Sequence, residues 1–141
     1  MSADNIKQFR QTLIDNNHHV TAVRQAIFAL LISPEPQSIG EIIAKGSVDR
    51  VSVYRNIELF EKLDIVHRIY VGWKYKLELS DKYIAHHHHL SCLSCGRIID
   101  IEDEEHIDHF ITEISLKFGF EPRHHQFEID GYCRDCAAKA E

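Results

Sequence analysis

The sequence predicts an α+β protein built of two small domains. Residues 1–80 contain runs with helical spacing that end in two β-rich segments, whereas the later residues mix strand-like runs with one helical run. The charge changes at the same place: 10 Lys and Arg against 9 Asp and Glu give +1 before residue 81, and 6 against 13 give −7 afterwards, which together make the formal −6. All four cysteines and 8 of the 11 histidines follow the change. We therefore expect domains at 1–80 and 86–141, joined by a polar hinge at 81–85.

Length and composition exclude several classes of protein. With 141 residues, 44% of them hydrophobic and 27% charged, the chain has a globular composition and is too short for a large multidomain enzyme. Its apolar runs, such as 26–32, fall far short of the roughly 20 residues of a membrane span, so no membrane partner is expected. The segment MSADNIKQFRQ lacks the features of a secretory signal. We therefore expect a cytoplasmic protein with reduced cysteines.

The first domain is expected to begin with four helices. Apolar residues recur near helical spacing in the first run, and Thr21 is a good N-cap for the second. Pro34 and Pro36 end the second run, because proline lacks an N–H donor and disfavours helix at the residue before it. Ser38 then caps a short third helix. The expected helices cover residues 5–16, 22–32, 39–44 and about 50–63.

Two β-rich runs follow, IVHRIYV and KYKLEL, on either side of Gly72-Trp73. The tight turn between them predicts a β-hairpin. Helices followed by a hairpin indicate a winged helix-turn-helix. Within this hairpin, His67 is interpreted as a surface or sheet residue.

The second domain is expected to be a small α+β unit. After HHHHLSC come a strand at 97–101, an acidic turn, a helix at about 105–118 stopped by Gly119, and an alternating strand at 125–130. The segment GYCRDC and a small tail complete it. A unit of about 60 residues is small enough that a bound metal would help it to fold.

Two CxxC pairs, Cys92 with Cys95 and Cys133 with Cys136, predict a structural Zn²⁺ site. This spacing lets both thiolates of a pair reach one tetrahedral ion. The apparent binding energy of structural zinc in peptides is roughly 10–16 kcal/mol, more than so small a core gains alone. A redox dithiol and unrelated free thiols are the alternative interpretations, which the presence of two pairs disfavours.

Four consecutive histidines lie in mid-chain at 86–89, so they are no terminal tag. On an extended strand alternate side chains face opposite sides, which sends His87 and His89 one way and His86 and His88 the other. Imidazole and carboxylate ligands suit Fe²⁺, Zn²⁺ and Mn²⁺. One run could therefore serve two metal sites, and a polyhistidine surface tract with adventitious affinity is the alternative. The nearby carboxylates are Glu78, Asp81, Asp100 and Asp108.

Four segments in this order resemble the ferric uptake regulator superfamily of metal-dependent repressors: VTAVRQAIFALL, RVSVYRNIELFEKLDIV, HHHHLSCLSCG and GYCRDC. The VYRN and HHHxLxCxxCG elements are specific to that family, and the resemblance spans nearly the whole chain. It implies a winged-helix DNA-binding domain followed by a metal-binding α/β dimerisation domain. The implied partners are double-stranded operator DNA and a second copy of the chain.

The resemblance also implies DNA-binding residues in the second helix and in the recognition helix. Tyr54 is implied to contact a thymine methyl group, and Arg55 a phosphate or a base. We add Arg50 and Lys74 as candidate DNA contacts because of their positive charge and their positions, at the start of the recognition helix and in the hairpin. A core position for Tyr54 and ordinary solvated surface for Lys74 are the alternatives. The candidate DNA-binding residues are Arg24, Arg50, Ser52, Tyr54, Arg55 and Lys74.

By the same resemblance, the sensory ligands are Glu78, His87, His89 and Asp100, and the ligands of an additional site are His86, His88, Asp108 and His125. Relatives usually carry a domain-bridging histidine before the third helix, where this chain has Pro36-Gln37. His18, His19 or water is expected to close the coordination sphere, or else activation is weaker. The gap between Glu78 and His87 is long for some relatives, which leaves Asp81 as a substitute.

The sequence thus predicts a dimeric transcriptional regulator, a repressor, that binds palindromic operator DNA when its sensory site holds a divalent metal, with Fe²⁺ favoured. Zinc uptake regulation and peroxide sensing through bound iron are alternatives within the same superfamily. A zinc hydrolase lacks support, because HExxH, GxSxG and a phosphate loop are all absent, so no enzyme is expected. A metal buffer would explain the histidines and leave VYRN unexplained.

Overall fold

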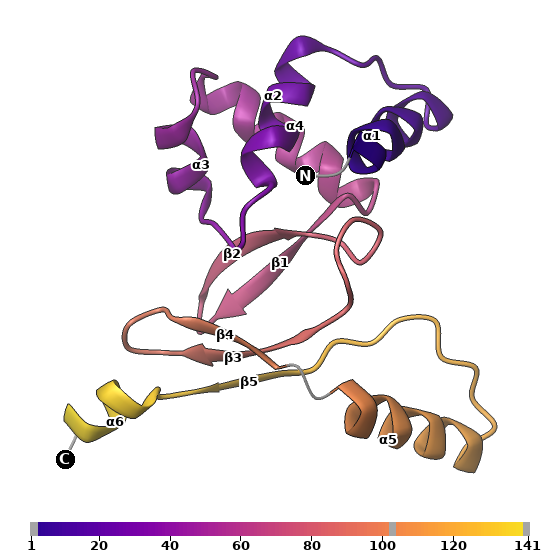
Figure 1. The fold of residues 1–141 in the computed structure, drawn as a ribbon, viewed down its shortest axis with the longest axis vertical. Coiled ribbons are helices and arrows are strands. Elements are labelled where there is room, and N and C mark those ends of the chain that lie inside the picture. The colour runs from indigo at the N-terminus through magenta and orange to yellow at the C-terminus, as the bar shows by residue number, and fades with distance from the viewer. Residues whose placement is uncertain (1–2, 102–103, 140–141) are drawn as a thin grey trace. The chain divides into compact units, whose positions relative to one another are not determined.

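The computed structural model describes residues 3–101 and 104–139, which form two compact units, Met1–Ala85 and His86–Glu141 (Figure 1). The first unit combines helices with a two-stranded sheet, and the second a three-stranded sheet with helices. This is the α+β class that the sequence predicts. Residues 81–85, expected to form a hinge, belong to the first unit.

The helices of the first unit are α1 (Ala3–Asp15), α2 (Ala22–Leu31), α3 (Ile39–Lys45) and α4 (Arg50–Lys62). Three of them begin at a side chain that accepts a hydrogen bond from the first turn, as N-caps do. Thr21 accepts from the amide of Arg24, Ser38 from that of Glu41, and Asp49 from that of Ser52. The predicted helices are confirmed to within two residues at each end.

A hairpin of β1 (Val66–Val71) and β2 (Lys74–Leu79) completes the first unit. The strands are antiparallel, and their register pairs His67 with Glu78. Gly72 has φ of 65°, which favours glycine, and lets the chain turn tightly. Trp73 follows it at the tip, where its side chain is 86% exposed.

The core of the first unit is aromatic at its centre. The ring of Phe9 in α1 stacks on Phe28 in α2 at 4.2 Å and meets Phe60 in α4 edge-on at 5.4 Å. Tyr83 is buried against Phe28 at 5.3 Å, so the segment after β2 is packed into this unit. The guanidinium of Arg68 bonds Glu61 at 3.0 and 3.1 Å, which ties the hairpin to α4.

The second unit has β3 (His88–Cys92) at the centre of its sheet, with β4 (Ile98–Ile101) antiparallel on one side and β5 (Glu128–Gly131) parallel on the other. Helix α5 (Glu104–Lys117) ends just before Gly119, whose φ is 60°. The strand predicted at 125–130 begins three residues later, because residues 121–127 take no regular structure. A short helix, α6 (Arg134–Lys139), lies where only a tail was expected.

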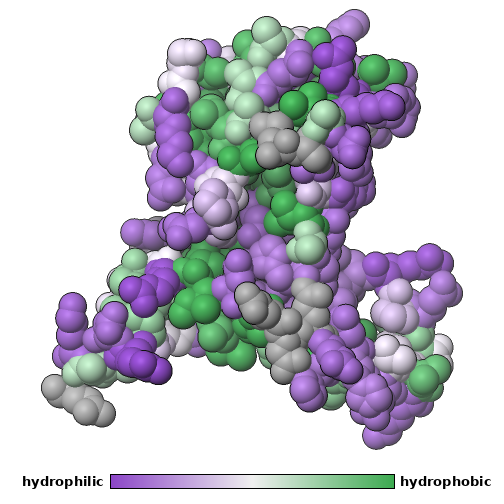
Figure 2. Space-filling view, in the orientation of Figure 1, coloured by the Kyte–Doolittle hydropathy of each residue, from purple (hydrophilic) through white to green (hydrophobic). Residues whose placement is uncertain are grey.

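The two units differ sharply in what they bury. The continuous apolar core is formed by residues of the first unit, from Phe9 to Tyr83. Among the described residues of the second unit, the sole buried side chain classed as hydrophobic is Cys92. Large apolar side chains there are exposed instead, and Figure 2 shows apolar surface over the strands of that unit. None of the described helices has the length and apolar character needed to cross a membrane.

Candidate metal centres and nucleic-acid interface

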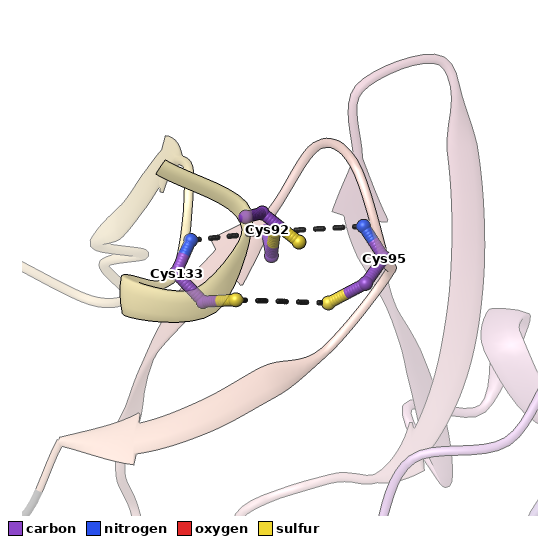
Figure 3. Close-up of side chains that lie close together, drawn as sticks. Cys92, Cys95 and Cys133 are labelled. Carbon is purple, nitrogen blue, oxygen red and sulfur yellow. Dashed lines mark hydrogen bonds between the residues drawn. The ribbon is translucent and has the colours of Figure 1, made fainter. Parts of the chain in front are cut away.

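Four thiols converge at one end of the second unit's sheet. Cys92 ends β3, Cys95 lies in the turn towards β4, and Cys133 and Cys136 lie at the start of α6. Their four sulfurs lie within 4.8 Å of one another. The sulfurs of Cys95 and Cys133 are 3.9 Å apart (Figure 3), close to the separation of about 3.8 Å that Zn–S bonds of about 2.3 Å give at a tetrahedral angle. The donor set therefore fits Zn²⁺.

The backbone around these thiols is shaped to hold them. Gly96 has φ of 76° and its amide donates to the carbonyl of Cys92 at 2.9 Å, which closes a tight knuckle after the first pair. The amide of Leu93 donates to the carbonyl of Gly131 at 2.7 Å and so joins this knuckle to the chain before the second pair. Two distant CxxC motifs are thereby brought together.

The electrostatics of the cluster favour a thiolate at Cys92. The amides of Cys133 and Cys95 donate to its sulfur at 3.3 and 3.5 Å, and they lower the pKa of Cys92 to about 6. The pKa of Cys136 is raised to about 11: a hydrogen bond with Ser94 lowers it, but the neighbouring Cys133 thiol, burial and the other cysteines raise it more. Thiolates are the form that ligates metal.

A second cluster gathers three imidazoles and one carboxylate. His86 and His88 come from β3 and the residues before it, Asp108 from α5, and His125 from the irregular segment before β5. The Nε2 atoms of His86 and His125 are 2.9 Å apart, and Nε2 of His125 lies 4.0 Å from Oδ1 of Asp108. His88 is 2% exposed. All four donor atoms lie within 4.8 Å of one another, which suits a divalent ion with nitrogen and oxygen ligands.

The other two histidines of the run meet a carboxylate of the neighbouring strand. The register of β3 and β4 pairs His89 with Asp100. Oδ1 of Asp100 is 3.6 Å from Nε2 of His89 and 3.7 Å from Nε2 of His87, and the two imidazole rings are 4.6 Å apart. His89 is buried and His87 half-buried. Two imidazoles and one carboxylate at these distances can serve as ligands of one divalent ion.

Glu78, the remaining sensory candidate, lies in the first unit on β2. Its Oε1 atom is 3.3 Å from Nε2 of His67, and the two side chains are 11% and 29% exposed. Asp81, the substitute, is exposed in the turn after β2. The sequence led us to interpret His67 as a surface or sheet residue, without this contact to Glu78. The signal was available, because a two-residue turn at Gly72-Trp73 places residue 67 opposite residue 78.

Four of the six candidate DNA-binding residues lie in the N-terminal half of α4. Tyr54 is 41% exposed, so it is a surface residue and the alternative of a core aromatic is wrong. Arg55 is exposed, and the guanidinium of Arg50 lies 5.9 Å from the centre of the Tyr54 ring. The hydroxyl of Ser52 donates a hydrogen bond to the N-cap residue Asp49 at 2.7 Å, so Ser52 helps to stabilise the start of α4.

Arg24 and Lys74 differ in how they are held. The guanidinium of Arg24 donates to Oδ1 of Asn56 at 3.1 Å and to the carbonyl of His19 at 2.7 Å, so it ties α2 to α4. Lys74 is exposed beside the hairpin tip, with Nζ 5.3 Å from the centre of the Trp73 ring. Arg24 is therefore engaged in the structure, whereas Lys74 projects from it.

Comparison with known proteins gives consistent matches. A sequence profile of the ferric uptake regulator family matches residues 15–130. The chain is 34% identical over 137 residues to the ferric uptake regulation protein of Vibrio anguillarum, covering 92% of this chain and 90% of that protein. It is 25% identical to the peroxide operon regulator of Bacillus subtilis, covering 99% and 98%. The crystal structure of the Vibrio cholerae ferric uptake regulator aligns with a TM-score of 0.74 at 30% identity, covering 88% of this chain and 98% of that one.

Proposed function

The chain belongs to the ferric uptake regulator family, and from that membership we propose that it is a repressor that binds palindromic operator DNA as a dimer when a sensory site holds a divalent metal. Family members are metal-responsive transcriptional regulators rather than enzymes. The observation that carries the proposal is the division of one histidine run between two sets of carboxylate partners. The same chain exposes an aromatic and a basic side chain, Tyr54 and Arg55, on α4.

The four cysteines hold structural Zn²⁺ in this proposal. A tetrahedral all-thiolate site is closed, so it serves folding rather than catalysis or sensing. Its role follows from the second unit, whose described residues bury so few apolar side chains. The binding energy of such a site replaces part of the missing core.

The sensory ion is bound by Glu78, His87, His89 and Asp100, and we propose Fe²⁺. Two imidazoles with carboxylates suit Fe²⁺, Mn²⁺ and Zn²⁺, whereas the sphere proposed here contains no thiolate of the kind that selects soft ions. Ligands drawn from both units would let the ion favour one of their mutual orientations, and hence one spacing of two recognition helices. His86, His88, Asp108 and His125 form the additional site.

The exposed residues of the second unit support dimerisation. Side chains of α5 and the segment after it, such as Phe110, Leu116 and Phe120, are 60%, 77% and 69% exposed. An accumulation of exposed large apolar side chains is typical of protein interfaces. We place the dimer in the cytoplasm, where operator DNA and free Fe²⁺ are both available.

Operator binding across a metal series tests this function. His89→Ala removes a buried ligand, so we expect it to reduce metal-stimulated binding to the DNA upstream of the protein's own gene at least tenfold. We expect the same effect from Glu78→Ala. His109→Ala is the control, since that imidazole is exposed on α5 and pairs only with Glu113 at 3.2 Å among the contacts described. Unchanged metal dependence in both ligand variants would show that the sensory assignment is wrong.

Peroxide sensing is a second candidate, favoured by the similarity to the Bacillus subtilis regulator over nearly the whole chain. A comparison of the Fe²⁺ form with the Mn²⁺ form distinguishes peroxide sensing from metal-responsive repression, because bound Fe²⁺ reduces peroxide readily. A peroxide sensor loses operator binding after brief peroxide treatment of the Fe²⁺ form and keeps it in the Mn²⁺ form. If Zn²⁺ alone at submicromolar free concentration activates binding, zinc uptake regulation is the function instead.

A further inference from the structure

We propose that His67 of β1 is a ligand of the sensory metal, and that it takes the place of the domain-bridging histidine that Pro36-Gln37 does not supply. This inference rests on the function proposed above. With His67 included, the first unit supplies two ligands of the sensory metal, an imidazole from His67 and a carboxylate from Glu78. Both residues lie within one hairpin.

Neither Pro36 nor Gln37, the two residues at the position of the missing histidine, offers a ligand in its place. Proline has no donor atom in its side chain. Gln37 is 2% exposed, its Nε2 donates to the carbonyl of Leu30 at 2.7 Å, and its Oε1 accepts from Nζ of Lys45 at 2.7 Å. Its backbone is also paired with Leu77 of β2 at 3.0 and 2.6 Å. The side-chain amide is therefore committed to Leu30 and Lys45, and the backbone of Gln37 holds this segment against the hairpin.

The geometry of His67 and Glu78 suits two neighbouring ligands of one ion. Metal–ligand bonds of about 2.1 Å place adjacent donor atoms about 3.0 Å apart at a right angle and about 3.4 Å apart at a tetrahedral angle. The Nε2–Oε1 distance is 3.3 Å, which lies in this interval. A charge-assisted hydrogen bond between the same groups would be shorter, about 2.7–2.9 Å.

The surroundings of the pair also favour a bound cation. The two side chains face each other across a register pair of antiparallel strands, so the backbone fixes their spacing. Glu78 is largely shielded from water, and a shielded carboxylate attracts a cation more strongly than an exposed one. His18 and His19 lie in the turn before α2, where the carbonyl of His19 is held by Arg24. Among the first-unit contacts described for Glu78, the histidine is His67.

The competing role is a positioning one, in which His67 merely orients Glu78 by a hydrogen bond. Two variants separate these roles. His67→Ala removes both the ligand and the hydrogen bond, whereas His67→Gln keeps an N–H donor and lacks the imidazole nitrogen. A positioning residue is rescued by Gln, and a ligand is not.

The test is Co²⁺ binding to full-length, zinc-loaded protein in an Asp108→Ala background, which weakens the additional site so that one Co²⁺ site is read by its visible absorption. We expect both His67→Ala and His67→Gln to weaken Co²⁺ binding at least tenfold and to change the d–d spectrum, with zinc content and thermal midpoint retained. His18→Gln is the matched control and is expected to behave as the parent.

Two outcomes overturn the proposal. Parental affinity and spectrum in His67→Gln would show that His67 only positions Glu78, and parental behaviour in both variants would remove it from the site. His89→Ala in the same background separates this failure from a failure of the proposed function. If only His89→Ala loses Co²⁺ binding, the sensory site exists but does not include His67. If none of the variants changes Co²⁺ binding, the proposed sensory site itself is wrong.

Discussion

His86 and His87 are adjacent in the sequence and belong to different clusters. Successive side chains of an extended segment point to opposite faces, so His86 reaches His125 while His87 reaches Asp100. The alternation could be read from the sequence. The carboxylate partners could not be derived from the histidine run alone, because Asp100 is placed by the register of β3 with β4 and Asp108 by the start of a helix.

Tyr54 and Arg55 are expected to act differently on DNA. Tyr54→Ala should weaken operator binding about tenfold and leave nonspecific DNA nearly unaffected, since a base contact carries about 1–3 kcal/mol of discrimination. If the Arg55 guanidinium contacts phosphate, Arg55→Ala should weaken the binding of operator and of nonspecific DNA alike. It should also lower the slope of log K against log salt concentration by about 1. Fluorescence anisotropy over a salt series measures both effects.

Lys62→Ala is the matched control for Arg55. It removes an exposed positive charge from the other end of α4, away from the proposed contacts. Equal salt slopes for the parent and Arg55→Ala would place Arg55 outside the DNA interface.

At the scale of elements, the start of α4 depends on one carboxylate. Asp49 accepts from both the hydroxyl and the amide of Ser52, at 2.7 and 3.0 Å, and these bonds lower the pKa of Asp49 below its usual 3.8. A carboxylate with a lowered folded-state pKa stabilises the fold above its unfolded-state pKa, and this contribution is lost as pH falls through the folded value.

We therefore expect Asp49→Asn to flatten the acid limb of stability below about pH 4, because Asn caps helices without titrating. Asp49→Ala should lower the thermal midpoint at neutral pH as well, since the cap itself is lost. Thermal unfolding followed by circular dichroism between pH 3 and 7 measures both variants. An acid limb in Asp49→Asn as steep as that of the parent would contradict the assignment.

Elements that carry their own start and stop signals could be predicted, and elements defined by packing could not. The helices of the first unit have Thr21, Ser38 and the prolines as boundaries, and they lie close to their predicted ranges. The alternating run 125–130 mimics a longer strand, yet His125 turns to His86 and the strand starts only at Glu128. Helix α6 has just six residues, too few for a periodic pattern to be visible.

At the scale of the molecule, the two units are stabilised by different means. The first unit has an aromatic and aliphatic core, whereas the second has a cysteine cluster and exposed apolar side chains. The charge divides in the same way, with an excess of acids in the second part that favours cations. The overall acidity of the chain therefore does not oppose DNA binding by the first unit.

Zinc removal is expected to unfold the second unit and dissociate the dimer while the first unit stays folded. Chelation under reducing conditions would remove the roughly 10–16 kcal/mol of apparent zinc-binding energy that this unit needs. Hydrogen exchange resolved by peptide should then show lost protection in 86–139 and retained protection in α1, α2 and α4. Sedimentation velocity should show monomers. A dimer that persists with protected β3 at near-zero zinc content would contradict this view of the second unit.

Trp73 is the single tryptophan of the chain, and it stands almost fully in water at the wing tip beside Lys74. All indole emission of the protein therefore comes from this one position. Stacking on a base or burial against the sugar-phosphate backbone would quench or shift that emission, whereas docking of α4 alone would leave it unchanged. The protein thus has a native fluorophore that reports contact of the wing with DNA separately from contact of the recognition helix, with no label attached.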